Sequence, residues 1–366
     1  MPTVISIAPY KFLPAKIGGQ KGIALFNQYF SRYVQLVCLT IAGNENNLAN
    51  YEAVELFPNS KWRYIDLFLF FRIRKILRQK QASHLLIEHP YFGWLGVLLK
   101  KFTRVKLIIH SHNIEGNRFK TLGKWWASIL WSYEKWTHRH ADYNFFVTEA
   151  DLNYAVQNFG LTASKCLVVT YGIERNAVPS KEEIIKAKQF VKNANHIGDD
   201  EKILFFNGSF NYAPNVDALN TIANVICPLL DTAGFKYKMI ICGPWLTNNH
   251  YDHPHLIIKG FVDNIEPYVL AADVFLNPVM DGGGIKTKLV EAISYNVNAV
   301  STHTGSTGVD PSICNGKLSL VEDGNWEVFA AHVIAQSNMN ADTPAAFYNY
   351  FYWGNNTKNA ADFIQI

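Results

Sequence analysis

The chain alternates short, continuous apolar runs with longer amphipathic stretches, and it does so in two successive series. Runs that are apolar on both faces are typical of parallel strands covered by helices on either side. The first series contains VISIA, VQLVCLT, HLLIE, VKLIIHSH, YNFFVT and CLVVTYG, and the second contains KILFFNG, KMIICG, LIIKGF, VFLNPV and NAVSTH. Two series of this kind predict two doubly wound α/β domains.

The length of the chain also favours two domains, because 366 residues exceed what one ordinary hydrophobic core supports. The break falls around residues 172–200, where GIERNAVPS has the character of a linker and a charged stretch follows before the second series begins. We therefore predict one domain over residues 1–172 and another over 173–345. Ligands of open α/β sheets bind beyond the carboxyl ends of the strands, so a cleft between the domains is the expected site.

Composition narrows the class of protein. A formal net charge of +4 with 17% charged residues argues against disorder and against a dedicated nucleic-acid binder. The amino terminus begins with a strand pattern rather than a leader, and no uncharged apolar run reaches the ~18 residues of a spanning helix. The cysteines show no CxxC pair and no zinc-site spacing: Cys38, Cys166, Cys227, Cys242 and Cys314. We expect a reduced, cytoplasmic protein.

Residues 277–295, NPVMDGGGIKTKLVEAISY, place three glycines between an apolar strand and a helix expected over 285–295. Successive glycines let backbone N–H groups converge on a ligand, and a helix start adds unpaired N–H donors and the positive end of its dipole. Lys286 and Lys288 lie at this start, where the positive end of the helix dipole repels their charge. A bound anion would offset this repulsion. The pattern indicates either a phosphate site or a tight turn with two solvated lysines.

Glu291 lies further along the same expected helix. A carboxylate only accepts hydrogen bonds, which suits two neighbouring hydroxyls such as those of a ribose. The alternative is a surface contact with Lys288, three residues earlier on the helix. The residues of this stretch by themselves leave both interpretations open.

The longer segments resemble the family 4 retaining glycosyltransferases, which have the two-domain GT-B fold. Residues 207–230, NGSFNYAPNVDALNTIANVICPLL, resemble the start of their nucleotide-binding domain, and 255–309 are similar to their donor-site core. AKIGGQKGIALFNQYF resembles their first glycine loop, LIIHSHNIEGNRF the strand and loop facing the donor, ADYNFFVTEAD a strand-to-helix turn and LVVTYGIE the interdomain crossing. The last segment, 346–366, resembles the helix that crosses back to the first domain.

The resemblance implies a role for each matching residue. In the donor-binding domain, Glu291 would hold the ribose hydroxyls and the main chain at Val262 would meet the nucleobase. The loop facing the diphosphate and the sugar would comprise Asp281, Gly282, Gly283 and Gly284, with Gly208 and Ser209 beside it and Lys286 and Lys288 supplying charge. In the acceptor-binding domain, Gly18 and Gly19 would approach the phosphates. His112 would touch the donor sugar, flanked by Asn113 and Glu115, which we also take as candidate catalytic residues.

Two departures from the family pattern concern this donor site. The frequent Glu-x7-Glu spacing would put a first glutamate at position 283, where this chain has Gly283, and Asp281 stands two places early. The usual arginine and lysine after the first strand of the donor domain are also missing, since no cation precedes Pro214 after Ser209. We expect Lys286 or Lys288, with the helix start, to meet the charge of the diphosphate instead.

The resemblance implies a hexosyl-type, retaining transferase of cell-envelope polysaccharide biosynthesis. It would use a nucleoside-diphosphate sugar as co-substrate, without a permanent cofactor or a metal, and act on a glycan, lipid-linked or other small acceptor. The departures keep a non-catalytic sugar-nucleotide-binding protein open as an alternative, and a sugar-nucleotide 2-epimerase has a similar architecture. No nucleic-acid partner is expected.

Two aromatic-rich segments, 61–81 and 120–140, also contain many Lys and Arg residues. Either could rest on an anionic membrane surface, which would put the protein at the inner face of the membrane. The alternative is that the aromatic residues belong to the hydrophobic core and the basic residues form a solvent-exposed face. We favour this alternative. His89 and His110 receive no role, and Thr148 with Asp151 fits a helix-capping box.

Overall fold

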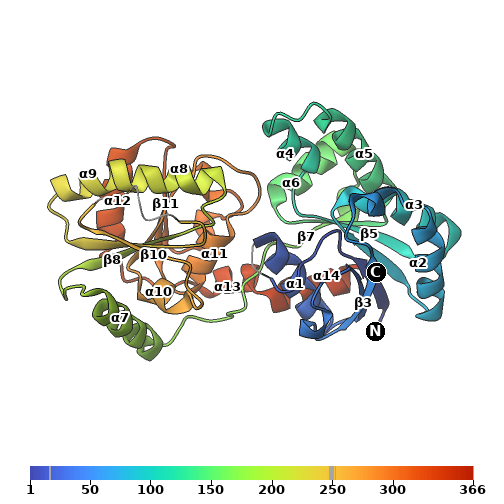
Figure 1. Ribbon diagram of the computed structural model, residues 1–366, viewed down its shortest axis with the longest axis horizontal. Helices are drawn as coiled ribbons and strands as arrows, with labels where there is room; N and C mark the ends of the chain where they lie inside the picture. The colour runs from blue at the N-terminus through green and yellow to red at the C-terminus, as the bar shows by residue number, and fades with distance from the viewer. Residues whose placement is uncertain (16–17, 247–250, 252, 366) are drawn as a thin grey trace. The chain divides into compact units, whose positions relative to one another are not determined.

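The computed structural model describes residues 1–15, 18–246, 251 and 253–365, and it divides the chain into two compact units. Unit 1 joins residues 1–174 to the last segment of the chain, from Phe351 onward. Unit 2 comprises Arg175–Tyr350. Figure 1 shows a sheet with helices on both sides in each unit, so the predicted pair of doubly wound α/β sheets is confirmed.

Within the described residues, unit 1 contains a parallel seven-stranded sheet of order β3-β2-β1-β4-β5-β6-β7. The strands are β1 (Thr3–Ile7), β2 (Gln35–Ile41), β3 (Glu52–Phe57), β4 (His84–Glu88), β5 (Lys106–Ser111), β6 (Tyr143–Phe146) and β7 (Cys166–Val168). The chain order reverses between β1 and β4, which pair directly. Ligands of such sheets bind at this kind of switch point.

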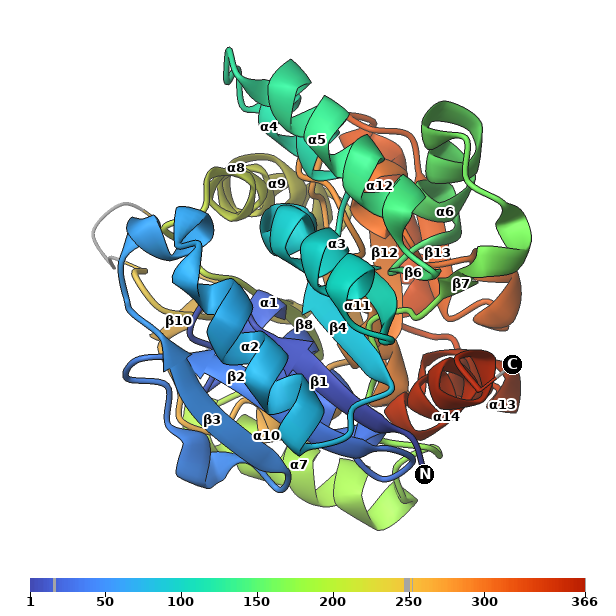
Figure 2. The ribbon, with the colours of Figure 1, turned by 90° about the vertical axis from the view of Figure 1, so that its right-hand side faces the viewer.

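The helices of unit 1 cover both faces of this sheet. They are α1 (Gly18–Phe30), α2 (Phe68–Gln79), α3 (Gly93–Phe102), α4 (Glu115–Thr121), α5 (Ala127–His140), α6 (Glu149–Tyr154) and α14 (Trp353–Phe363). Helices α2, α3 and α5 lie side by side on one face (Figure 2), while α1 packs with α14. The side chain of Thr148 accepts a hydrogen bond from the Asp151 N–H and begins α6, so the predicted cap is confirmed.

Helix α2 shows why its sequence was ambiguous. Leu69, Ile73 and Leu77, four residues apart, are buried against the sheet. Phe68 and Phe71 point the other way and are 76% and 64% exposed. The interpretation of the aromatic residues of this segment as core is therefore wrong for these two side chains, because the apolar run is wider than the face that the sheet covers.

Unit 2 contains, among its described residues, a parallel six-stranded sheet of order β10-β9-β8-β11-β12-β13. The strands are β8 (Lys202–Asn207), β9 (Tyr237–Cys242), β10 (Leu256–Gly260), β11 (Val274–Asn277), β12 (Asn298–Thr302) and β13 (Leu318–Val321). The helices are α7 (Lys181–Asn195), α8 (Ala213–Thr221), α9 (Cys227–Thr232), α10 (Glu266–Ala271), α11 (Thr287–Ser294), α12 (Trp326–Gln336) and α13 (Ala345–Phe351).

Two further observations bear on the sequence predictions. All five cysteines are free and buried, so no disulfide holds the fold. Within the part of the chain that the structure describes, we find no helix both long enough and apolar enough to pass through a bilayer.

Candidate active site

The predicted donor-site residues of unit 2 lie where its parallel strands end. Gly208 and Ser209 follow β8, Val262 follows β10, and the loop from Asp281 to Lys286 follows β11. Because parallel strands end at one edge of the sheet, these loops share that edge. Helix α11 starts there at Thr287, two residues later than predicted, because the backbone of Lys286 is not helical. No side chain caps this start, and its first turn contains no acid.

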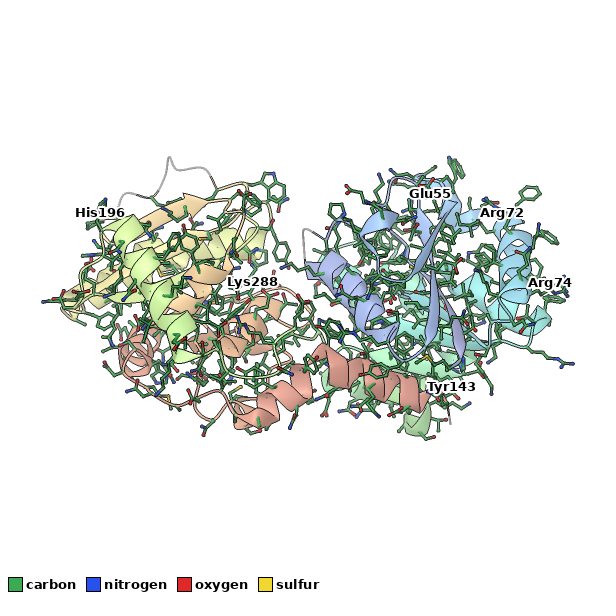
Figure 3. The ribbon with its side chains drawn as sticks, turned by 90° about the horizontal axis from the view of Figure 1, so that it is seen from below. Glu55, Arg72, Arg74, Tyr143, His196 and Lys288 are labelled. Atoms are coloured by element: carbon green, nitrogen blue, oxygen red, sulfur yellow. The ribbon has the colours of Figure 1, made fainter. Side chains whose placement is uncertain are left out.

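Lys288 is the most constrained cation of this edge. Its Nζ donates a hydrogen bond to Asn215 Oδ1 at 3.2 Å and lies 5.9 Å from the centroid of the Phe206 ring. Burial lowers the pKa of Lys288 to about 8, while the nearby Glu291 carboxylate raises it and Lys286 lowers it. Burial removes part of the hydration of this ammonium group and so disfavours its charged form. An anion bound beside it would stabilise the charged form. Figure 3 marks its place in unit 2.

The glycine loop is shaped by its own backbone and by Lys286. Nζ of Lys286 donates to the carbonyl oxygens of Asp281, at 3.3 Å, and of Gly282. Gly282 and Gly284 have φ angles of +93° and +72°, a region that favours glycine. Gly283 has no positive φ, and a Cβ built on it would meet nothing within 4 Å. The loop therefore has room for a side chain at position 283, and the absence of the family's first glutamate there has no steric cause.

The turn after β8 brings the backbone close to this helix start. Nδ2 of Asn215 donates to the Ser209 carbonyl at 2.8 Å, while its Oδ1 accepts from Lys288. A Cβ on Gly208 would lie 3.0 Å from the Asn215 side chain. Asn215, on α8, therefore ties the two predicted loops together. Asn215 could not be predicted from the sequence, because this contact joins positions 73 residues apart.

Glu291 lies on α11 one turn after Lys288 and is half-buried. Asn215 links Lys288 to the Ser209 carbonyl, and the charge of Lys288 interacts with Glu291 and with Lys286, which binds the carbonyls of Asp281 and Gly282. The other predicted donor residues lie in the same two loops: Gly208, Gly283 and Gly284. Val262 shares their edge of the sheet, and Gly260, two residues earlier, turns the chain with φ of +65°. The Gly243 N–H binds the Gly260 carbonyl at 2.7 Å, which holds this turn against the end of β9.

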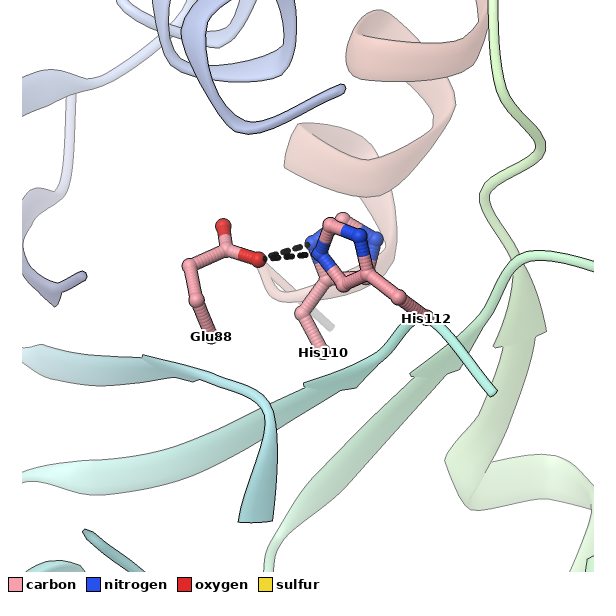
Figure 4. A group of neighbouring side chains, drawn as sticks. All are labelled: Glu88, His110 and His112. Carbon is pink, nitrogen blue, oxygen red and sulfur yellow. Dashed lines mark hydrogen bonds and ion pairs between the residues drawn. The ribbon is translucent and has the colours of Figure 1, made fainter. Parts of the chain in front are cut away.

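In unit 1, His112 stands directly after β5, and a buried glutamate holds it. Nε2 of His112 lies 2.7 Å from Oε2 of Glu88, at the end of β4, and Nδ1 of His110 lies 3.0 Å from the same oxygen (Figure 4). Burial alone would raise the pKa of Glu88, but the two imidazoles hold that pKa well below its usual range. A Cβ built on Gly22 of α1 would lie 3.8 Å from His112 Nδ1.

A second buried carboxylate supports the neighbouring ring. Rings His89 and His112 stack with centroids 4.4 Å apart, and Nδ1 of His89 lies 3.3 Å from Oε1 of Glu115. Tyr91 and Arg118 donate to the other oxygen of Glu115, at 2.9 and 3.1 Å. Burial opposes the ionisation of Glu115, yet His89 and Arg118 hold its pKa at about 2. We expected Glu115 beside a substrate, but the structure encloses it completely.

The remaining predictions of unit 1 lie at the same edge of its sheet. Asn113 follows His112, and its carbonyl accepts from Ser111 Oγ at 2.7 Å. Gly18 and Gly19 are exposed at the start of α1, which has no acid in its first turn. A Cβ on Gly19 would lie 3.4 Å from the Tyr10 hydroxyl. That hydroxyl binds Nε2 of His89 at 3.1 Å, so the glycines lie near the histidine group.

Glu88, His110 and His112 are also a group that could hold a metal ion, with ligand atoms within 4.8 Å of one another. We did not predict this group from the sequence. The 2.7 Å contact is a hydrogen bond from the His112 N–H to the carboxylate, and His110 lies at ion-pair distance, 3.0 Å, from the same oxygen. We therefore treat it as a hydrogen-bonded group that orients His112.

Comparison with known proteins assigns both halves of the chain. Residues 32–176 match the sequence model of Glycosyltransferase Family 4, and residues 201–337 match that of Glycosyl transferases group 1. The two matches together cover roughly three quarters of the chain.

Solved structures agree in fold. A glycosyltransferase from Rickettsia africae ESF-5 has a TM-score of 0.73 at 14% identity, covering 100% of this chain and 98% of that chain. HepE from Anabaena, in complex with UDP, has a TM-score of 0.72 at 14% identity, with 100% of both chains covered. Sucrose-phosphate synthase from Thermosynechococcus elongatus has a TM-score of 0.72 at 12% identity, covering 100% and 98%.

At these sequence identities the solved structures show a similar fold and nothing more. That fold is GT-B, as predicted. The family assignment rests on the two sequence matches, and it confirms the resemblance drawn from the glycine loop and its surroundings. The chain is a glycosyltransferase that belongs to the family 4-like group 1 glycosyltransferases.

Proposed function

We propose that the protein is a retaining glycosyltransferase that moves a hexosyl group from a nucleoside-diphosphate sugar to a glycan, lipid-linked or other small acceptor. The observation that carries the proposal is the uncapped start of α11. It follows a glycine loop, has Lys286 and the buried amine of Lys288 beside it, and bears Glu291 one turn along. Among proteins of this fold, HepE from Anabaena is solved with UDP and with UDP-glucose, which supports a nucleotide-sugar donor.

Different groups of unit 2 would bind the nucleoside of the donor and its diphosphate and sugar. Glu291 would accept hydrogen bonds from the ribose hydroxyls, and the main chain at Val262 would meet the base. Lys286, Lys288 and the N–H groups at the helix start would take the diphosphate charge without a metal ion. Gly208, Ser209 and Gly282–Gly284 would let the backbone approach the phosphates and the sugar, with Asp281 beside them.

In the transfer step, the bond between the anomeric carbon and the diphosphate oxygen would break, with its electron pair leaving on that oxygen. The acceptor hydroxyl would form the new bond on the same face, and its proton would pass to the departing phosphate. The enzyme would contribute positioning and stabilisation of the leaving charge. His112, with Asn113 next to it, would contact the transferred sugar, and Gly18 and Gly19 would face the phosphates. Glu115 would hold His89 in place.

The test uses slow donor hydrolysis, so that no acceptor need be known. Purified protein is incubated with UDP-α-glucose and the first sugar released is followed by proton NMR. We expect α-glucose to appear first, and Glu291→Ala to abolish the signal. Release of β-glucose would contradict retention. Conversion of the donor to its 2-epimer, or binding without any turnover in the presence of sugar acceptors, would contradict the transferase.

A further inference from the structure

Unit 1 exposes an unusual set of large apolar side chains. They lie in η2 (Lys61–Ile65), in α2, at the end of α3 and from the end of α4 into α5. Their exposed fractions range from 52% to 86%. The set comprises Trp62, Ile65, Leu67, Phe68, Phe71, Phe102, Leu122, Trp125 and Ile129. Single exposed apolar side chains are common, but a cluster of them marks a surface that binds a protein, a ligand or a membrane.

The fold puts this set on one face of the sheet. The connections from β3 to β4, from β4 to β5 and from β5 to β6 all advance in the same direction across the sheet. Right-handed crossovers therefore place α2, α3 and α5 on the same face, as Figure 2 shows. Phe70 of α2 contacts Phe102 of α3, with ring centroids 5.8 Å apart. The two segments 61–81 and 120–140 thus contribute to one surface, which we call the helical face.

The exposed residues concentrate at the end of this face nearest His112. Helix α2 runs between the end of β3 and the start of β4, so its first turn lies at the carboxyl edge of the sheet. A chain of ring contacts connects the two places. Tyr64 of η2 lies 6.0 Å from Tyr91, Tyr91 lies 5.4 Å from His89, and His89 lies 4.4 Å from His112.

The charge of the helical face is almost entirely positive. The segments 61–81, 93–106 and 120–140 contain only two acids: Asp66 accepts a hydrogen bond from the Phe68 N–H, and Glu134 is buried. Figure 3 shows Arg72 and Arg74 on α2, at the outside of unit 1. The exposed cations of these segments are Lys61, Arg72, Lys75, Arg78, Lys101, Arg104, Lys106, Lys120, Lys124 and Arg139. Aromatic residues among many cations suit the interface of an anionic bilayer.

We propose that the helical face docks on the surface of an anionic lipid bilayer, with Trp62, Phe68, Phe71 and Trp125 entering the headgroup region. A protein partner would have to present acidic residues opposite the cations of three helices. An anionic bilayer carries negative charge over its whole surface, so it matches these cations without a specific arrangement. Docking holds the His112 edge of unit 1 at the bilayer. Given the proposed function, the acceptor is then one that a lipid presents at this surface.

The test is flotation with lipid vesicles of phosphatidylcholine containing 40% phosphatidylglycerol, compared with phosphatidylcholine alone. We expect the protein to float with the anionic vesicles, to bind the neutral ones at least tenfold more weakly, and to be released at about 0.5 M salt. Equal binding to both compositions, or to neither, would overturn the proposal.

Two variants locate the contact. Phe68→Ser with Phe71→Ser should weaken vesicle binding by about tenfold or more, because both side chains leave the interface. Arg72→Glu with Lys75→Glu should weaken binding to anionic vesicles by a similar factor. The matched control is Ile185→Ser with Phe190→Ser on α7 of unit 2, where both side chains are also more than half exposed. The control should float like the wild type, and a loss as large as that of the α2 variants would overturn the assignment.

Failure of this proposal is separable from failure of the proposed function. The α2 variants should keep the stabilisation of the protein by UDP, since that site lies in unit 2. Vesicle binding without any effect of UDP would uphold the helical face and refute the donor site. If sedimentation velocity showed a dimer that the Phe68→Ser/Phe71→Ser variant separates, with no vesicle binding, the face would be a contact between two copies and the membrane proposal would be wrong.

Discussion

Glu88 accepts a hydrogen bond from Nε2 of His112 at 2.7 Å, with its own side chain fully buried. This contact fixes the proton of the imidazole on Nε2 and orients the ring. Nδ1 is left on the side of Gly22, in the helix that begins with the predicted phosphate glycines. In the proposed function His112 contacts the donor sugar, and we infer that Glu88 acts as a positioning residue by fixing the orientation of this ring.

Replacement of Glu88 should affect both stability and turnover. Glu88→Gln keeps an acceptor oxygen but removes the negative charge that both imidazoles contact through Oε2. We therefore expect donor hydrolysis to slow by about tenfold or more with a smaller change in KM. Glu88→Ala should also lower the free energy of unfolding by about 2–4 kcal/mol, measured by urea titration. The control is Glu52→Gln at the exposed pair with Lys80. Equal kinetics for Glu88→Gln and the control would contradict the positioning role.

His138 should make stability depend on pH. Burial lowers the pKa of His138 to about 4, while the hydrogen bond that its Nδ1–H donates to Asn144 Oδ1 raises it. The unfolded chain titrates at about 6.5. Between these values the unfolded state binds more protons, so stability is present above about pH 6.5 and is lost as the pH falls towards 4. Relative to His138→Gln, the wild type should lose about 1.4 kcal/mol per pH unit in that window.

The check on His138 is the difference between two series of urea titrations, at pH 7 and at successively lower pH. Carboxylates that titrate in the same range contribute to both proteins and cancel in the comparison. Parallel slopes for the wild type and His138→Gln would show that the buried imidazole is not the group responsible.

Lys288→Ala should weaken UDP binding by about 10- to 100-fold, because in the proposed site the partly dehydrated amine would contact the diphosphate. Since the pKa of Lys288 is lowered to about 8, the affinity of the wild type should decline as the pH rises through that value. The decline should be weaker in the variant. Isothermal titration calorimetry measures both effects, with Lys186→Ala at an exposed site of α7 as control. Similar small losses in both variants would remove Lys288 from the donor site.

Two adjacent glycines of the loop should respond differently to the same change. Gly282→Ala places a Cβ 2.5 Å from the Tyr212 hydroxyl at φ of +93°, and should cost about 1–2 kcal/mol of stability. Gly283→Ala meets open space without a positive φ, and should stay within about 0.5 kcal/mol of the wild type. Thermal unfolding of the two variants side by side decides this. A larger loss for Gly283→Ala would show that the loop has another conformation.

Much of the fold could be predicted because each buried parallel strand is a continuous apolar run that stands out locally. Strand β3 was not predicted, since Glu52 and Glu55 interrupt its apolar pattern at the edge of the sheet. Strand β13 was not predicted either, because it is only four residues long. At the start of α2, apolar residues occupy every position from Leu67 to Phe71, so periodicity could not tell the buried side from the exposed one.

The candidate site was predictable where its residues are neighbours in the sequence, as in the loop from Asp281 to Glu291. It was not predictable where the parts meet only in the fold. Glu88 and His112 are 24 positions apart, and Asn215 and Lys288 are 73 apart. The burial of Glu115 depends on Tyr91 and His89, which lie on another strand connection, and nothing local to residue 115 signals it.

A thermal-shift panel tests the donor site of unit 2, on which the proposed function depends. UDP, GDP, ADP, CMP and dTDP are compared on the wild type and on Glu291→Ala, at about 100 times the expected dissociation constant. One diphosphate should stabilise the wild type by about 2.7 kcal/mol, a few degrees in the melting midpoint, and this shift should disappear in the variant. If no nucleotide stabilises the wild type, or if Glu291→Ala keeps the full shift, the donor site is not the one built around α11.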